Sequence, residues 1–171
     1  MAEQHDRILG YCLEEANEHL DTIEQGLRKL AETVKEPATI RELFRAAHSI
    51  KGSAAMLGLT DVQQVGNQFE ANFRLLKEQP QIEVDHQLQS LFLESFSFLR
   101  AAISDAKAAN DPARRERGAL DPVGDPVFEE LKSYLQCLLD RTNPAHVTAN
   151  TRAHNLTQAP ALEQVFGEYV T

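Results

Sequence analysis

The chain has 171 residues, which suffices for one sizeable hydrophobic core and does not require two domains. Its 42% hydrophobic and 25% charged residues are ordinary for a soluble globular protein, and its apolar runs are too short to span a membrane. The net charge of −9 disfavours nucleic acid as a partner, and the polar start MAEQHDR lacks the features of a secretory signal. We therefore expect a cytoplasmic protein whose partners are proteins, without a membrane or nucleic-acid role.

The first part of the chain predicts four amphipathic helices, because apolar residues recur there at steps of three and four. Pro37 ends the first helix or starts the second, Gly58 can supply a left-handed stop, and Thr60 or Asp61 would cap the third. The third helix ends before Pro80. The first, second and fourth predicted helices span residues 7–34, 38–57 and 84–109. This pattern predicts an antiparallel four-helix bundle over residues 1–109.

The second part of the chain changes character after Asn110. Residues 110–125 are rich in Asp, Pro, Arg and Gly without a regular period, which predicts a linker. Residues 126–141 have a helical apolar period and could dock on the fourth helix as an accessory helix. Residues 142–171 are expected to form a flexible tail or linker, although a short terminal helix near their end is possible. The fold class is therefore all-α, a four-helix bundle with an additional C-terminal helix.

The most informative stretch is AHSIKGSA, residues 47–54, in the second predicted helix. At about 100° per residue, His48 points roughly 140° away from the centre of that helix's apolar stripe, and therefore outward. Lys51 and Gly52 follow at i+3 and i+4, adjacent to His48 on the helix surface. An ammonium group there can stabilise negative charge beside the imidazole. Without this spacing, both side chains would be interpreted as ordinary solvated residues. The apolar stripe consists of Ile40, Leu43, Ala47, Ile50, Ala54 and Leu57.

Gly52 needs a reason, because glycine inside a helix costs about 1 kcal/mol relative to alanine. Close approach of a partner to the bare backbone beside His48 would supply one. Phe44, Ala55 and Met56 lie around the same part of the helix and are candidates for an apolar ring on which that partner docks. Packing of Phe44 and Met56 at the edges of the bundle has equal weight at this point.

The HxxKG motif formed by His48, Lys51 and Gly52, within the run LFRAAHSIKGSAAMLGL, resembles the phosphorylation motif of histidine-containing phosphotransfer (HPt) domains. It is most similar to the N-terminal phosphotransfer domain of chemotaxis-type histidine kinases, over roughly the first 105 to 140 residues. The resemblance implies a phosphohistidine carrier in two-component signalling. His48 would accept a phosphoryl group from a histidine kinase domain or a phospho-receiver and donate it to a receiver-domain aspartate.

The same resemblance assigns a role to Glu70, near the boundary of the third helix's apolar face. The family usually has a glutamate there, which hydrogen-bonds the non-phosphorylated imidazole nitrogen and leaves the other nitrogen as the nucleophile. Chemotaxis-type members usually have a second histidine three residues earlier. Asn67 occupies that position here, and it can form hydrogen bonds but cannot titrate. A two-histidine network is therefore in doubt.

Several functions lack their sequence signals. The scattered glycines form no phosphate-binding loop, so we do not expect kinase activity from the chain alone, and ATP and magnesium would belong to its partner. The five other histidines and the distant Cys12 and Cys137 lack ligand spacing, so neither a metal nor a cofactor is expected. The main alternative is a helical docking or scaffold module without phosphotransfer. Both a free-standing protein and a fragment of a histidine kinase fit the sequence.

Overall fold

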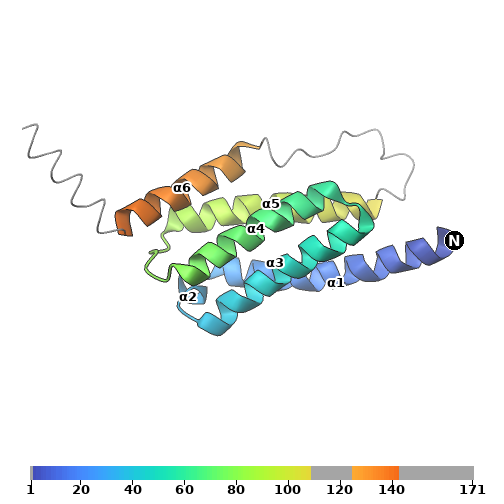
Figure 1. Cartoon of the computed structure of the whole chain (residues 1–171), viewed down its shortest axis with the longest axis horizontal. Coiled ribbons are helices and arrows are strands. Elements are labelled where there is room, and N and C mark those ends of the chain that lie inside the picture. The colour runs from blue at the N-terminus through green and yellow to red at the C-terminus, as the bar shows by residue number, and fades with distance from the viewer. Residues whose placement is uncertain (1, 109–124, 143–171) are drawn as a thin grey trace, which may run out of the picture.

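The computed structural model describes residues 2–108 and 125–142, and these residues form six helices and no strand (Figure 1). Consecutive long helices run in opposite directions, and α6 lies along α5 (Figure 1). Phe69 and Phe73 of α4 pack in the core against Phe92 of α5, with ring centroids 6.2 and 5.8 Å from it. This confirms the predicted all-α bundle with an additional C-terminal helix. The helices are α1 (Ala2–Arg28), α2 (Leu30–Thr33), α3 (Pro37–Leu57), α4 (Thr60–Glu78), α5 (His86–Ala108) and α6 (Pro126–Thr142).

The first predicted helix is divided in the structure. Lys29 has φ −129° and ψ 43°, which ends α1 and separates it from the short α2. The hydroxyl of Thr33 donates a hydrogen bond to the carbonyl oxygen of Gly26 at 2.9 Å across this break. Leu27 and Leu30 are fully buried on its two sides, so the apolar period continues through it. The prediction of one continuous helix over residues 7–34 is therefore wrong. The spacing of the apolar residues does not reveal the break, because it is the same on both sides of Lys29.

The ends of α3 follow the sequence, whereas the start of α4 does not. Pro37 is the first residue of α3, and Gly58 stops that helix with φ 69°. Neither Thr60 nor Asp61 caps α4, because Leu59 is the residue before the helix and no side chain makes a capping hydrogen bond. The turn after Gly58 is so short that Thr60 already belongs to the helix.

The predicted accessory helix, residues 126–141, is α6 in the structure and docks on α5 as expected. Phe128 of α6 contacts Phe98 of α5 edge to face, with ring centroids 5.7 Å apart. The hydroxyl of Tyr134 donates a hydrogen bond to the carboxylate of Asp85, whose other oxygen accepts the N–H of Leu88 at the start of α5. The predicted linker apart from Asp125 and the predicted tail apart from Thr142 lie outside the described residues. The buried residues of α6 are Val127, Phe128, Leu131, Leu135 and Leu138.

Leu131 tests this docking because its side chain is 1% exposed. Leu131→Ala should lower the free energy of unfolding by about 2 to 4 kcal/mol, since it removes buried methyl groups and leaves a cavity. Urea unfolding measures the effect, with the exposed neighbour Lys132→Ala as the control that should change little. Equal stability of the two variants would show that α6 is not packed on α5 in solution.

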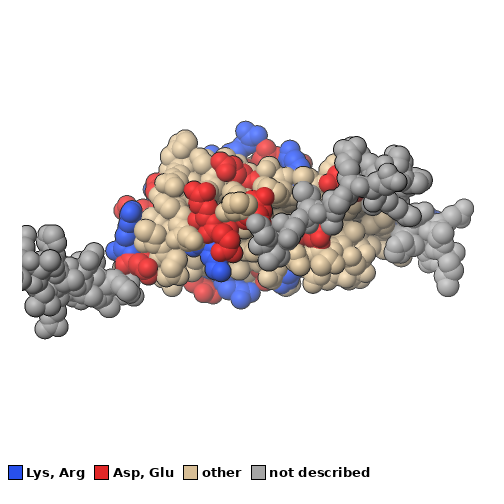
Figure 2. All heavy atoms as spheres, turned by 90° about the horizontal axis from the view of Figure 1, so that it is seen from above, with Lys and Arg blue, Asp and Glu red and all other residues tan. Residues whose placement is uncertain are grey.

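Charge is unevenly distributed over the bundle. Residues 37–78, which contain α3 and α4, have five Lys or Arg and four Asp or Glu, against 17 and 26 in the whole chain. The helix pair that contains His48 is thus slightly positive, and the remaining residues account for all of the negative excess. Figure 2 looks down on the side where α6 lies and shows acidic side chains gathered in the middle of that face. In the described part of the chain, no helix is long and apolar enough to cross a membrane.

Candidate functional site

His48 lies on the outer face of α3, with its side chain 62% exposed. Its neighbours Ala47 and Ile50 are almost completely buried. The other members of the predicted apolar stripe are also buried, apart from Leu57, which is half-buried. The outward direction predicted for His48 is therefore confirmed.

Glu70 reaches His48 from α4. Its Oε1 lies 3.3 Å from Nδ1 of His48, and its Oε2 forms an ion pair with Nζ of Lys51. Arg74, one turn further along α4, places Nη2 3.1 Å from the same Oε1. An imidazole nitrogen that donates to a carboxylate keeps its proton, so in the neutral ring Nε2 has the free lone pair. The arrangement thus leaves Nε2 of His48 available as a nucleophile.

The electrostatic environment keeps Glu70 ionised. Burial raises the pKa of the carboxyl, but hydrogen bonds from Lys51 and His48, together with their positive charges, outweigh burial and hold the pKa of Glu70 below its usual value. The carboxylate is therefore negatively charged at neutral pH. It can stabilise positive charge that develops on the imidazole of His48.

The depth of Glu70 differs from the prediction. The sequence placed it at the edge of the apolar face of α4, but the residue is 4% exposed and therefore buried. Gly66, one turn earlier, accounts for this burial, because a Cβ at position 66 would lie 3.3 Å from the backbone of Lys51. The missing side chain lets α3 and α4 approach closely and cover Glu70. Sequence reasoning missed Gly66, although a glycine inside a helix one turn from a candidate site residue was a usable signal.

Arg74 was also missed. Its position four residues after Glu70 is the spacing of an intrahelical ion pair, which was visible in the sequence. Lys77, another α4 cation, lies over the ring of Phe44 with Nζ 4.7 Å from the ring centroid. The outer part of α4 thus supplies two cations beside the His48 region.

The three candidate docking residues have different environments. The half-buried Phe44 packs at the edge of the core, and its ring lies nearly parallel to that of His48, with centroids 6.3 Å apart. Ala55 is exposed, and Met56 is 86% exposed. Packing at the bundle edge therefore describes Phe44 and is wrong for Met56. Docking of a partner on these residues stays a prediction.

The remaining candidates, Gly52 and Asn67, are both exposed. A Cβ at Gly52 would meet no atom within 4 Å, so no contact inside the described structure requires glycine there. This is compatible with a role in partner approach. Asn67 lies three residues before Glu70 on α4, where the structure gives it no specific role.

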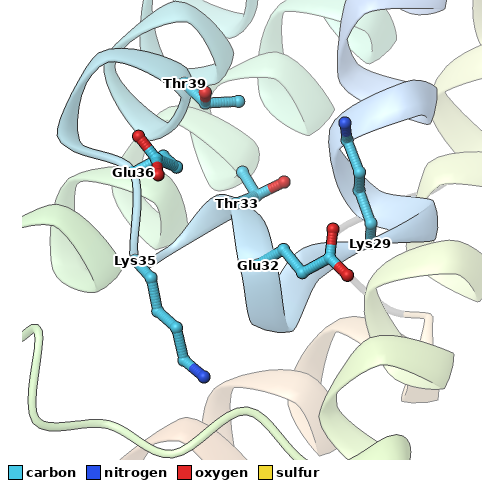
Figure 3. Close-up of a pocket in the computed structure, with 6 residues that line it drawn as sticks. All are labelled: Lys29, Glu32, Thr33, Lys35, Glu36 and Thr39. Atoms are coloured by element: carbon cyan, nitrogen blue, oxygen red, sulfur yellow. The ribbon is translucent and has the colours of Figure 1, made fainter.

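The described ranges bring together no group of three or more His, Cys, Asp or Glu suited to a metal ion. A hollow of about 370 Å³ lies where α2 meets α3 (Figure 3). Thr39, at its α3 edge, precedes His48 by nine residues, about 13 Å along the helix. The hollow is therefore separate from the His48 region. Its lining residues are Lys29, Glu32, Thr33, Lys35, Glu36 and Thr39.

Comparison with protein families places this geometry in a known context. The family model of the Hpt domain matches residues 7–109, which cover α1 from its residue 7 onward and all of α2, α3, α4 and α5. The chain belongs to the Hpt domain family. Hpt domains are phosphohistidine carriers of phosphorelay signalling, so this is the functional class of the chain.

The curated relatives are much longer proteins. The chain is 31% identical to the chemotaxis protein CheA of Rhizobium meliloti over 152 residues, which are 88% of this chain and 19% of that protein. It is 27% identical to CheA of Borreliella burgdorferi over 101 residues, 59% of this chain and 12% of the relative. The Hpt chain thus spans less than a fifth of either relative. No solved structure matches it.

Proposed function

We propose that His48 accepts a phosphoryl group from a histidine kinase domain or a phospho-receiver and donates it to the aspartate of a response-regulator receiver domain. The supporting observation is an exposed imidazole whose Nδ1 contacts a buried, ionised Glu70. ATP and magnesium are provided by the kinase partner, and the exchange takes place in the cytoplasm. The Hpt chain itself contributes the carrier and no ATP site.

The transfer steps require no proton movement on His48. Nε2 attacks the γ-phosphorus of ATP, the N–P bond forms, and the bond to the leaving ADP breaks. The ring then has a proton on Nδ1 and a phosphoryl group on Nε2, and the carboxylate of Glu70 balances its positive charge. When a receiver aspartate attacks phosphorus, the N–P bond breaks and the neutral ring returns. Lys51 adds positive charge on the same helix face.

The docking surface in this proposal combines Phe44, Ala55 and Met56 with the open backbone of Gly52. Phe44 supports the ring of His48 from the side, while Met56 offers a flexible apolar side chain to a partner. Residues 1–109 would constitute the phosphotransfer unit. Residues 110–125 would form the linker, 126–141 the accessory helix and 142–171 a tail or linker.

Phosphotransfer is tested directly by incubating the chain with a histidine kinase domain and Mg-ATP. Mass spectrometry under alkaline conditions should find one phosphoryl group per chain, because phosphohistidine survives alkali. Addition of a receiver domain should then remove it. A chain that stays unlabelled with several kinase domains would support the alternative of a docking or scaffold module.

Gly52→Ala separates stability from partner access. The substitution should raise the free energy of unfolding by up to about 1 kcal/mol, because alanine favours the helix and the added methyl group meets no neighbour. Transfer between His48 and its partners should nevertheless slow, and more so in Gly52→Leu. Time courses of phosphoryl transfer measure the rate, and urea unfolding measures the stability. Unchanged transfer in Gly52→Leu would show that partners do not approach this part of α3.

A further inference from the structure

The carboxylate of Glu70 has more partners than an isolated contact with His48 requires. Lys51 binds Oε2, whereas His48 and Arg74 share Oε1 at 3.3 and 3.1 Å. His48 and Arg74 therefore compete for the negative charge on Oε1 of Glu70. Arg74 is a side chain at the rim of the site, 53% exposed, whereas the Glu70 side chain is 6% exposed.

We propose that Arg74 is a positioning residue that sets how much of the negative charge of Glu70 acts on the imidazole of His48. This inference rests on the proposed phosphocarrier function and adds a residue to it. Arg74 does not touch the reacting Nε2 and acts only through Glu70. Its guanidinium withdraws part of the carboxylate's charge from His48 and helps to orient the carboxylate.

The surroundings single out Arg74 as the adjustable partner. The charged groups that face Glu70 are His48 and Lys51 from α3 and Arg74 from α4. Lys51 occupies the other oxygen and lies at the close contact with Gly66. Arg74 also lies over Phe44, at 5.5 Å, but Lys77 lies over that ring at 4.7 Å and would remain there without Arg74. The loss of Arg74 should therefore leave the stacking of Phe44 on His48 in place.

The sign of the effect follows from electrostatics. In Arg74→Gln, one positive charge beside Glu70 is lost while Lys51 remains on Oε2, so a larger part of the carboxylate charge stabilises the imidazolium of His48. The midpoint of the His48 titration, followed by NMR in the unphosphorylated full chain, should rise by about 0.2 to 0.7 pH unit. Arg74→Lys, which keeps the charge at i+4, should restore most of the original midpoint.

The matched control is Arg28→Gln. Arg28 forms the same i,i+4 ion pair with Glu24 in α1, with a side chain 70% exposed, and it does not contact the site. Its loss should leave the His48 titration unchanged. The proposal is overturned if Arg74→Gln produces no shift, or if Arg28→Gln produces an equal one.

A second readout follows the nucleophile itself. Phosphoramidate can label the histidine chemically: the bond from Nε2 to phosphorus forms as the bond to the departing ammonia breaks. The pH profile of His48 labelling should move upward in Arg74→Gln by the same amount, with the exposed His86 as an internal reference. A profile that stays in place would overturn the proposal. If both shifts occur but no kinase domain labels His48, the role of Arg74 stands and the proposed carrier function is wrong.

Discussion

His48→Gln is expected to abolish labelling by a histidine kinase domain and Mg-ATP, whereas the unmodified chain takes up one acid-labile, alkali-stable phosphoryl group. The reason is that His48 combines an exposed ring with a buried carboxylate on its Nδ1 and with Lys51 on the same helix face. Glutamine keeps a polar side chain of similar size but has no nucleophilic nitrogen. Mass spectrometry of alkaline digests identifies the labelled residue.

The matched variant is His86→Gln, which removes another exposed histidine and should retain full labelling. Helical content by circular dichroism should be the same in both variants, since the 62% exposed His48 side chain contributes little to the core. Stoichiometric labelling of His48→Gln at a different histidine would contradict the assignment of the carrier.

Glu70→Ala is expected to slow phosphorylation of His48 about 10- to 100-fold. The substitution removes the acceptor that orients Nδ1 and the charge that supports the imidazolium. Because Glu70 is buried, Glu70→Ala should also leave Lys51 without its partner and destabilise the bundle. Glu70→Gln is the sharper variant, since it keeps the shape and an acceptor oxygen but loses the charge.

A comparison of the two variants separates orientation from charge. If Glu70→Gln retains most of the rate, hydrogen bonding dominates, whereas equal loss in both variants assigns the effect to charge. Normal rates in both would show that Glu70 has no part in the transfer. Initial rates with one kinase domain, measured over a range of pH, provide this comparison.

Stability should depend on pH through the same carboxyl. The pKa of Glu70 is lower in the folded chain than its ordinary value, so the folded state binds fewer protons than the unfolded state. Its contribution to stability is therefore present at neutral pH and is lost as the pH falls through the folded pKa. Glu70→Gln should lack this part of the acid destabilisation.

The long helices were predictable because their cause is local. Apolar residues that recur every three or four positions lie on one face of a helix, which is then buried. This pattern holds for α3, α4, α5 and α6. The stop at Gly58 followed from the left-handed conformation that glycine adopts easily. The break at Lys29 was not predictable in this way, since the buried Leu27 and Leu30 preserve the period on both sides.

The outward direction of His48, with Lys51 beside it, follows from the rotation of about 100° per residue in a helix. It could therefore be predicted from the positions of the apolar residues in that segment alone. The burial of Glu70 depends instead on how closely two helices approach. That distance is set by the side chains at the crossing, above all by the absence of one at Gly66 against Lys51. The carboxylate of Glu70 is shared by His48, Lys51 and Arg74 because of this packing. His48 and Lys51 belong to α3 and Arg74 to α4, and the periodicity within one helix does not show which residues of the other helix it contacts.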